Sequence, residues 1–148
     1  MSRFADDELL WEKQIETLNT VFDAPTTYIL GFESEKFHKK LAKHSEVLVN
    51  NDFEQTNVAY SISMGLKASK TEFNLVIYGD LYFNEACLRQ IKNSGEPFLA
   101  SNRKTFQKDE CGLWDKNNEV QRHAYDLPMV WAQINLLGPT ETKSLIEE

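Results

Sequence analysis

The chain has 148 residues, of which 41% are hydrophobic and 26% are charged. These proportions are those of an ordinary globular domain, so they argue against a disordered or low-complexity polypeptide. The 16 basic and 23 acidic residues give a net charge of −7. Because that balance argues against a broad phosphate-neutralising surface, we expect no nucleic-acid partner.

The two cysteines, Cys87 and Cys111, belong to no CxxC pair, so they predict neither a structural zinc site nor a redox motif. Such sparse cysteines suit buried thiols in a reducing cytoplasm. No segment approaches the roughly 20 apolar residues that span a bilayer, and the first residues do not resemble a signal peptide. We therefore expect a cytoplasmic protein without a membrane partner. Since no repeat or linker interrupts the sequence, residues 1–148 are expected to form a single domain.

The first half of the chain alternates between helical and extended patterns. Trp11, Ile15, Leu18 and Phe22 are spaced by four, three and four residues, which predicts one face of a helix. Strands are expected at 26–32, 47–49 and 73–78, and further helices from 34, after Thr56-Asn57 and at 83–91. The connections between these strands are too short for anything but parallel pairing.

The second half is richer in extended segments. Strands are expected at 97–101, 111–114, 119–123 and 129–137, followed by a helix that begins at Thr140 or Thr142. The polar stretch 115–118 is a plausible hairpin turn between two of them. Together the halves predict an α/β protein: a Rossmann-like three-layer sandwich with a mostly parallel central sheet and a hairpin-containing C-terminal half.

Gly79 and Asp80 follow the clearest strand of the sequence, Leu75-Val76-Ile77-Tyr78. In open parallel sheets, ligands bind outside the carboxyl ends of the strands. Glycine permits a sharp turn or the close approach of a ligand, and a carboxylate beside a phosphate suits Mg²⁺. The structural alternative is a turn or helix-capping aspartate, and the pattern alone does not choose between the two.

A second polar group runs from Asn50 to Ser61 (NNDFEQTNVAYS). Thr56, Asn57 and Ser61 are expected near a helix N-terminus, where backbone N–H groups and the helix dipole attract anions. Their side chains could also contact a base or a sugar. Plain capping, with Thr56 as the N-cap and no ligand, explains the same pattern.

The three histidines, His38, His44 and His123, are far apart in sequence and lack metal-ligand spacing. We interpret each as a surface or helix-face residue. The three tryptophans could stack on a base, but their positions in predicted strands and in an amphipathic helix favour the core.

Several short motifs, taken in order, resemble the nucleotidyltransferase superfamily, which includes the sugar-phosphate and choline-phosphate nucleotidylyltransferases. The resemblance covers most of the chain and rests on the segments Gln14–Leu18, Ile29–Phe32, Asn50–Leu66 and Val76–Asp80. It implies transfer of a nucleotide from a nucleoside triphosphate to a small phosphorylated acceptor of the sugar-phosphate or phosphocholine type. It also implies that Asp80 binds Mg²⁺, and that Thr56, Asn57, Ser61 and Gly79 lie where the family contacts nucleotide or acceptor.

The sequence also departs from that family's pattern. The chain starts at the helix that normally follows the family's first strand and glycine-rich phosphate loop, and its six glycines are isolated. No aspartate follows Asp126 to supply the family's second metal ligand. Arg103, Lys104 and Lys108 are modest candidates for phosphate contact, although a solvated surface explains them as well.

These departures predict a domain that is incomplete at its N-terminus, truncated, split or inactive. The alternative function is a non-catalytic nucleotide-binding or assembly module derived from the same fold. Such a module would have a central sheet that lacks one member, and a partner chain, a homo-oligomer or a borrowed strand would complete it.

Overall fold

The computed structural model describes residues 9–43, 45–102 and 110–147. The helices of the described residues are α1 (Leu10–Val21), α2 (Ser34–Leu41), α3 (Val58–Ala68), α4 (Glu85–Ser94) and α5 (Pro139–Glu147). Their strands are β1 (Thr27–Leu30), β2 (Glu46–Val49), β3 (Asn74–Ile77), β4 (Phe98–Asn102), β5 (Cys111–Lys116), β6 (Glu119–Tyr125) and β7 (Met129–Leu137).

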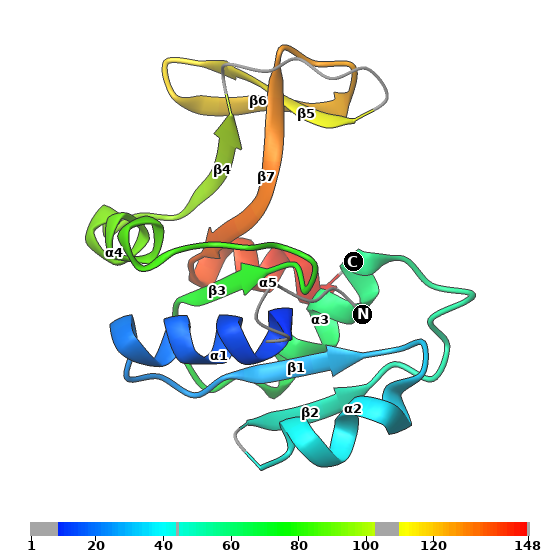
Figure 1. The fold of residues 1–148 in the computed structure, drawn as a ribbon. Coiled ribbons are helices and arrows are strands. Elements are labelled where there is room, and N and C mark those ends of the chain that lie inside the picture. The colour runs from blue at the N-terminus through cyan, green and yellow to red at the C-terminus, as the bar shows by residue number, and fades with distance from the viewer. Residues whose placement is uncertain (1–8, 44, 103–109, 148) are drawn as a thin grey trace.

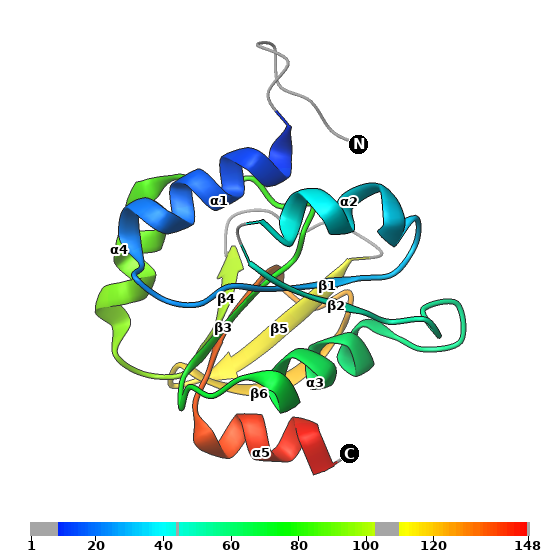
Figure 2. The same ribbon diagram turned by 90° about the horizontal axis from the view of Figure 1, so that it is seen from below.

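Helices cover the strands of the first half on both sides. α1 and α2 lie on one side of β1, β2 and β3, and α3 and α5 lie on the other (Figure 2). A side chain at Gly65 would place its Cβ 2.9 Å from Ile29 Cδ1, so the glycine lets α3 approach β1 closely. This arrangement is the three-layer α/β order predicted from the sequence.

The pairing of the strands differs from the prediction. β1 and β2 pair in parallel, with Thr27 opposite Glu46, as their short helical connection requires. β3 instead pairs antiparallel with β7, with Ile77 opposite Ile134. The remaining pairs of this five-stranded sheet are also antiparallel. A mostly parallel central sheet is therefore not confirmed, because the pattern within a strand does not specify which distant strand becomes its neighbour.

β7 bends sharply as it passes from β5 to β3 (Figure 1). Its residues 132–134 lie opposite the single residue 100 of β4, because Trp131 pairs with Ser101 and Asn135 pairs with Leu99. Within this bulge Gln133 has a φ of 58°, in the left-handed region. Bulges of this kind bend a strand and redirect its side chains.

The hairpin between β5 and β6 is confirmed. Asn117 and Asn118 have φ angles of 55° and 64°, as the two central residues of the preferred two-residue hairpin turn require. The backbone N–H of Asn118 also donates to Asp115 Oδ2 at 3.2 Å. Asparagine tolerates this conformation better than most residues, so the local sequence is sufficient to place the turn.

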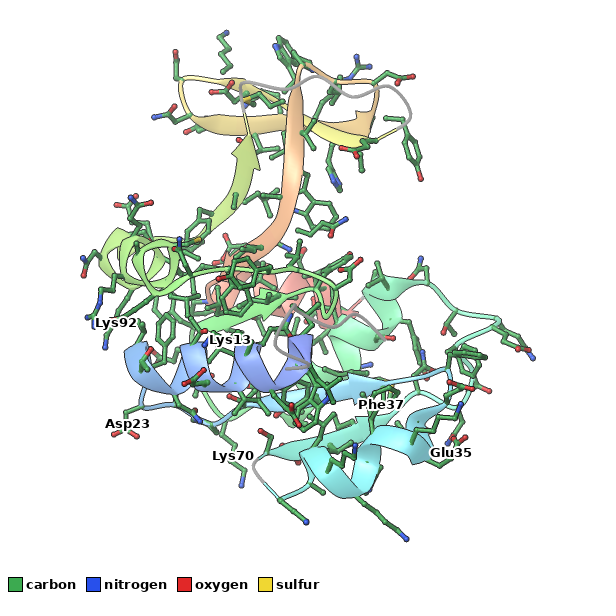
Figure 3. All side chains as sticks on the ribbon, in the orientation of Figure 1. Lys13, Asp23, Glu35, Phe37, Lys70 and Lys92 are labelled. Carbon is green, nitrogen blue, oxygen red and sulfur yellow. The ribbon has the colours of Figure 1, made fainter. Side chains whose placement is uncertain are left out.

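The core lies between α1, α4 and β7. Leu88 is fully buried, and it packs with four other buried residues: Val21, Phe83, Ile91 and Ile134. Lys92 of α4 extends to the end of α1 (Figure 3), where its Nζ donates to the backbone oxygen of Val21 at 2.7 Å. None of the described helices is both long and apolar enough to span a membrane.

Candidate functional site

The turn after β3 lies at the edge of the fold to which β1, β2 and β3 all point (Figure 1). Gly79 and Asp80 form this turn, and both are exposed. Gln14 of α1 holds it in place: its Nε2 donates to the backbone oxygens of Gly79 at 3.3 Å and Leu81 at 2.7 Å. Because Gln14 is only 6% exposed, these bonds satisfy a buried amide and fix the turn against α1.

Neither the backbone conformation nor the packing at position 79 requires a glycine. Its φ lies outside the left-handed region, and a Cβ built on it would have no heavy atom within 4 Å. The open space beside Gly79 therefore permits the close approach of a ligand, whereas the sharp-turn explanation does not apply. This space and the exposed carboxylate of Asp80 lie next to each other in the chain.

The polar residues after β2 are organised around Asn50, which is 2% exposed. Its Nδ2 donates to Thr56 Oγ1 at 2.9 Å and to Ser61 Oγ at 3.1 Å, and its Oδ1 accepts from the backbone N–H of Asp52 at 3.0 Å. The Thr56 hydroxyl in turn donates to the backbone oxygen of Asp52. Thr56 and Ser61 thus each have a hydrogen-bond partner within the loop, and Asn50 fixes their hydroxyl groups in place.

Asn57, rather than Thr56, is the N-cap of α3. Its side-chain oxygen accepts from the backbone N–H of Tyr60 at 3.1 Å. The first turn of α3 is exposed, so the N–H groups at this end of the helix can still reach an anion.

Several large apolar side chains near this edge are exposed. Phe32 after β1 is 72% exposed, Tyr82 after the Gly79–Asp80 turn is 61% exposed, and Val58 and Tyr60 open α3 at 50% and 44%. Aromatic faces at the edge of an α/β sheet can stack on a ring of a ligand. These residues were not predicted as site residues from the sequence, although an aromatic residue shortly after a strand is a recognisable signal.

A row of side chains leads from the end of β3 to the hairpin. Tyr78 contacts Trp131 edge to face with ring centroids 5.3 Å apart, and Trp131 contacts His123 in the same way at 4.9 Å. His123 Nε2 lies 3.1 Å from Cys111 Sγ. Burial raises the pKa of Tyr78, and the nearby Cys111 and Asp80 raise it further. The Tyr78 hydroxyl therefore remains a neutral donor and acceptor at physiological pH.

Among the described residues, no group of three or more His, Cys, Asp or Glu side chains is placed to hold a metal ion. A metal at Asp80 would take its other ligands from water and from phosphate oxygens of a bound nucleotide. Mg²⁺ is commonly held in this way, by one or two carboxylates and substrate phosphates. The exposed carboxylate of Asp80 fits that role.

Solved structures provide the comparison with known proteins. CTP:phosphocholine cytidylyltransferase from Streptococcus pneumoniae matches with a TM-score of 0.74 and 16% identity, over 97% of this chain and 63% of that one. Inositol-1-phosphate CTP transferase from T. maritima matches at 0.76 and 14%, over 96% and 62%. UDP-glucose pyrophosphorylase with UDP-glucose matches at 0.72 and 11%, over 99% and 70%.

The chain has the nucleotidyltransferase fold. The resemblance inferred from the short motifs is thus confirmed at the level of the fold, and the chain spans less than two thirds of the first two structures. No protein-family model matches the sequence, and no curated protein matches it.

Within this fold, the described strands form two separate sheets. β1 pairs with β2, and β3 pairs with β7, but no described ladder joins β1 to β3. All residues of β1 and β3 are half-buried, although Ile29, Leu75 and Ile77 are large and apolar. Each strand therefore has one row of backbone N–H and C=O groups outside the described ladders.

The structure thus brings Gly79 and Asp80 together with Gln14 and Tyr78. It holds Thr56 and Ser61 around Asn50 in a separate cluster at the same edge. Arg103, Lys104 and Lys108 lie outside the described residues.

An apolar cavity of about 250 Å³ opens at the other end of β3. Its lining residues are Phe22, Phe73, Leu75, Ile91, Lys92, Gly95 and Leu136. Because it is distant from the Asp80 turn along β3 and offers few polar groups, we do not place the ligand site there.

Proposed function

We propose that this chain is a nucleotidyltransferase-type domain that acts on a nucleoside triphosphate and a small phosphorylated acceptor of the sugar-phosphate or phosphocholine type. The observation that carries the proposal is the exposed Gly79–Asp80 turn, fixed by Gln14 at the carboxyl end of β3 in this fold. The structures it resembles are those of a cytidylyltransferase, a CTP transferase and a UDP-glucose pyrophosphorylase.

In this proposal Asp80 binds Mg²⁺, which supplies neutralising charge to the phosphates when it is bound. Gly79 leaves room for the nucleotide, and the exposed N-terminus of α3, with Asn57 and the Asn50-bound Thr56 and Ser61, positions an anionic group. In the reaction, an acceptor phosphate oxygen forms a bond to the α-phosphorus, and the bond to the β-phosphate oxygen breaks, releasing pyrophosphate.

Full turnover requires more cationic clamping of the phosphates than these residues supply. Each such contact is worth about 10²–10³ in rate, so the described residues alone are expected to bind nucleotide better than they transfer it. Binding is therefore the proper first test.

The test is calorimetric titration of the protein with CTP, UTP, GTP and ATP in the presence of Mg²⁺. We expect one base to bind, with affinity that falls at least tenfold in Asp80→Ala. Asp52→Ala is the matched control, because it removes an exposed carboxylate at the same edge and leaves the backbone bonds of Asp52 intact. The proposal fails if no nucleotide binds, or if Asp80→Ala and Asp52→Ala bind equally well.

A second candidate function is a non-catalytic assembly module, and the two unjoined sheets favour it. The backbone edges of β1 and β3 that lie outside the ladders of the described residues can accept an added strand from a homo-oligomer or a partner chain. Light scattering of the purified protein tests this candidate. A dimer whose amide exchange is slowed at β1 and β3 supports it, and a monomer at high concentration with fast exchange at both strands contradicts it.

A further inference from the structure

The contact between Cys111 and His123 is not explained by the fold or by the proposed nucleotide site. Cys111 begins β5 and His123 lies in β6, where it is displaced by two residues from Tyr125, the cross-strand partner of Cys111. Such diagonal neighbours reach each other when one side chain is large. The 3.1 Å between Cys111 Sγ and His123 Nε2 is short for a hydrogen bond to sulfur.

Trp131 of β7 holds the imidazole in this position. Its ring lies against that of His123 at an interplanar angle of 84°, and its Nε1 donates to the buried Asn135 at 2.8 Å. The imidazole of His123 is therefore oriented by Trp131, which is itself fixed by Asn135 of the same strand. A nucleophile, a base within hydrogen-bond distance and an orienting group are the arrangement that activates a side chain for covalent chemistry.

The exposure of the two residues suits a reaction with a reagent from solution. Cys111 is a free thiol and half-buried, and His123 is exposed. A zinc site requires about four ligands, and no third metal-binding side chain joins the pair among the described residues.

We propose that Cys111 and His123 form a thiol–imidazole pair, in which Cys111 is a modification site for low-molecular-weight disulfides and other soft electrophiles. The neutral imidazole accepts the thiol proton at Nε2, which requires that Nδ1 carry the other proton. The Cys111 sulfur then attacks one sulfur of the disulfide. A new S–S bond forms, the old one breaks, and the released thiolate takes up a proton, so that Cys111 is oxidised and the leaving half is reduced.

Cys87 is a demanding internal control. It is also free and half-buried, and it lies in the first turn of α4. It packs against the core cluster and has no described histidine contact. Because core packing alone can slow Cys87, the part of the rate difference that depends on His123 is what reflects the pair.

The experiment measures labelling of each cysteine by iodoacetamide and by oxidised glutathione at neutral pH, using peptide mass spectrometry. We expect Cys111 to react about tenfold faster than Cys87, and His123→Asn to remove most of this difference. In urea, both cysteines should react at similar rates, because the pair exists only in the folded chain.

His38→Asn is the control substitution, since it removes an imidazole from α2, away from the pair. If His123→Asn does not fold by circular dichroism, His123→Gln takes its place. The proposal is wrong if Cys87 reacts as fast as Cys111, if neither reacts faster than in urea, or if a folded His123 variant leaves the Cys111 rate unchanged.

Discussion

The loop after β2 and the turn after β3 lie at the same edge and contain similar polar residues, but they use them differently. After β2, the buried Asn50 binds Thr56, Ser61 and the backbone of Asp52, so the polar groups are matched within the loop. After β3, Gln14 holds only backbone oxygens and leaves the Asp80 carboxylate exposed. The comparison indicates that the polar groups of the first region are matched within the fold, whereas the second leaves its carboxylate exposed, as the proposed metal-binding role of Asp80 requires.

Asn50→Ala tests the structural side of this comparison and should have the largest effect. Three hydrogen bonds of a 2% exposed amide are lost, so the free energy of unfolding should fall by about 2–3 kcal/mol. Urea denaturation measures the change. Asn51→Ala is the control, because Asn51 is exposed, and it should change stability by less than about 0.5 kcal/mol. Equal effects of the two substitutions would remove the structural role given to Asn50.

Gln14→Met tests whether the turn after β3 depends on α1. The substitution keeps the volume but removes both bonds to the backbone oxygens of Gly79 and Leu81, so stability should fall by about 1–2 kcal/mol. Denaturation gives the loss, and hydrogen exchange of the 79–82 amides should become faster. Glu16→Ala on the exposed part of the same helix removes a surface ion pair with Lys13 and should cost little. Unchanged exchange in Gln14→Met would mean that the turn is held by other contacts.

Tyr28→Phe should stabilise the protein, in contrast to Asn50→Ala, which removes a buried polar group that has hydrogen-bond partners. The Tyr28 hydroxyl is buried and has no hydrogen-bond partner among the described residues, so its removal should add about 1 kcal/mol to the free energy of unfolding.

The same residue predicts a pH dependence. Burial raises the pKa of Tyr28 from 10.0 to about 12. Below pH 10 both the folded and unfolded states keep the proton. As the pH rises from about 10 to about 12, the unfolded state loses it first, so the free energy of unfolding decreases. Thermal denaturation across this range should show a shallower decrease in Tyr28→Phe, and identical slopes would contradict the assignment.

Asp80→Ala should have the smallest effect on stability, within about 0.5 kcal/mol of the parent protein. The carboxylate is exposed, so the fold loses little when it is removed. Thermal denaturation checks this, and nucleotide titration of the same variant shows whether binding changes. A large loss of stability would favour the turn-aspartate alternative over the metal-binding role.

The parts of the fold with strong local signals could be predicted from the sequence. The spacing of apolar residues places α1, and two consecutive asparagines, Asn117 and Asn118, place the hairpin turn. The pairing of β3 with β7 could not be predicted, because the two strands are more than 50 residues apart and each has the pattern of a buried strand.

The candidate site could be proposed from the sequence only where the local signal is strong, and its role stays a prediction. Gly79 and Asp80 follow a strand with a clear signal. The row from Tyr78 through Trp131 and His123 to Cys111 joins four strands or strand ends, so no spacing along the chain reveals it. Asn50 lay within a recognised polar segment, but its burial depends on the packing of the loop around it.

The bulge in β7 determines where the side chain of Trp131 lies. In a regular strand, the Cα atoms of residues four apart are separated by about 13 Å. Trp131 and Asn135 are four apart, yet Trp131 Nε1 donates to Asn135 Oδ1 at 2.8 Å. The bulge across 132–134 therefore brings these two side chains together, and Trp131 lies between Tyr78 and His123. Changes in the length of this segment would therefore reposition Trp131, and they would also reach the Asp80 turn, because the Gln133 backbone oxygen accepts from the backbone N–H of Tyr78 at 3.3 Å.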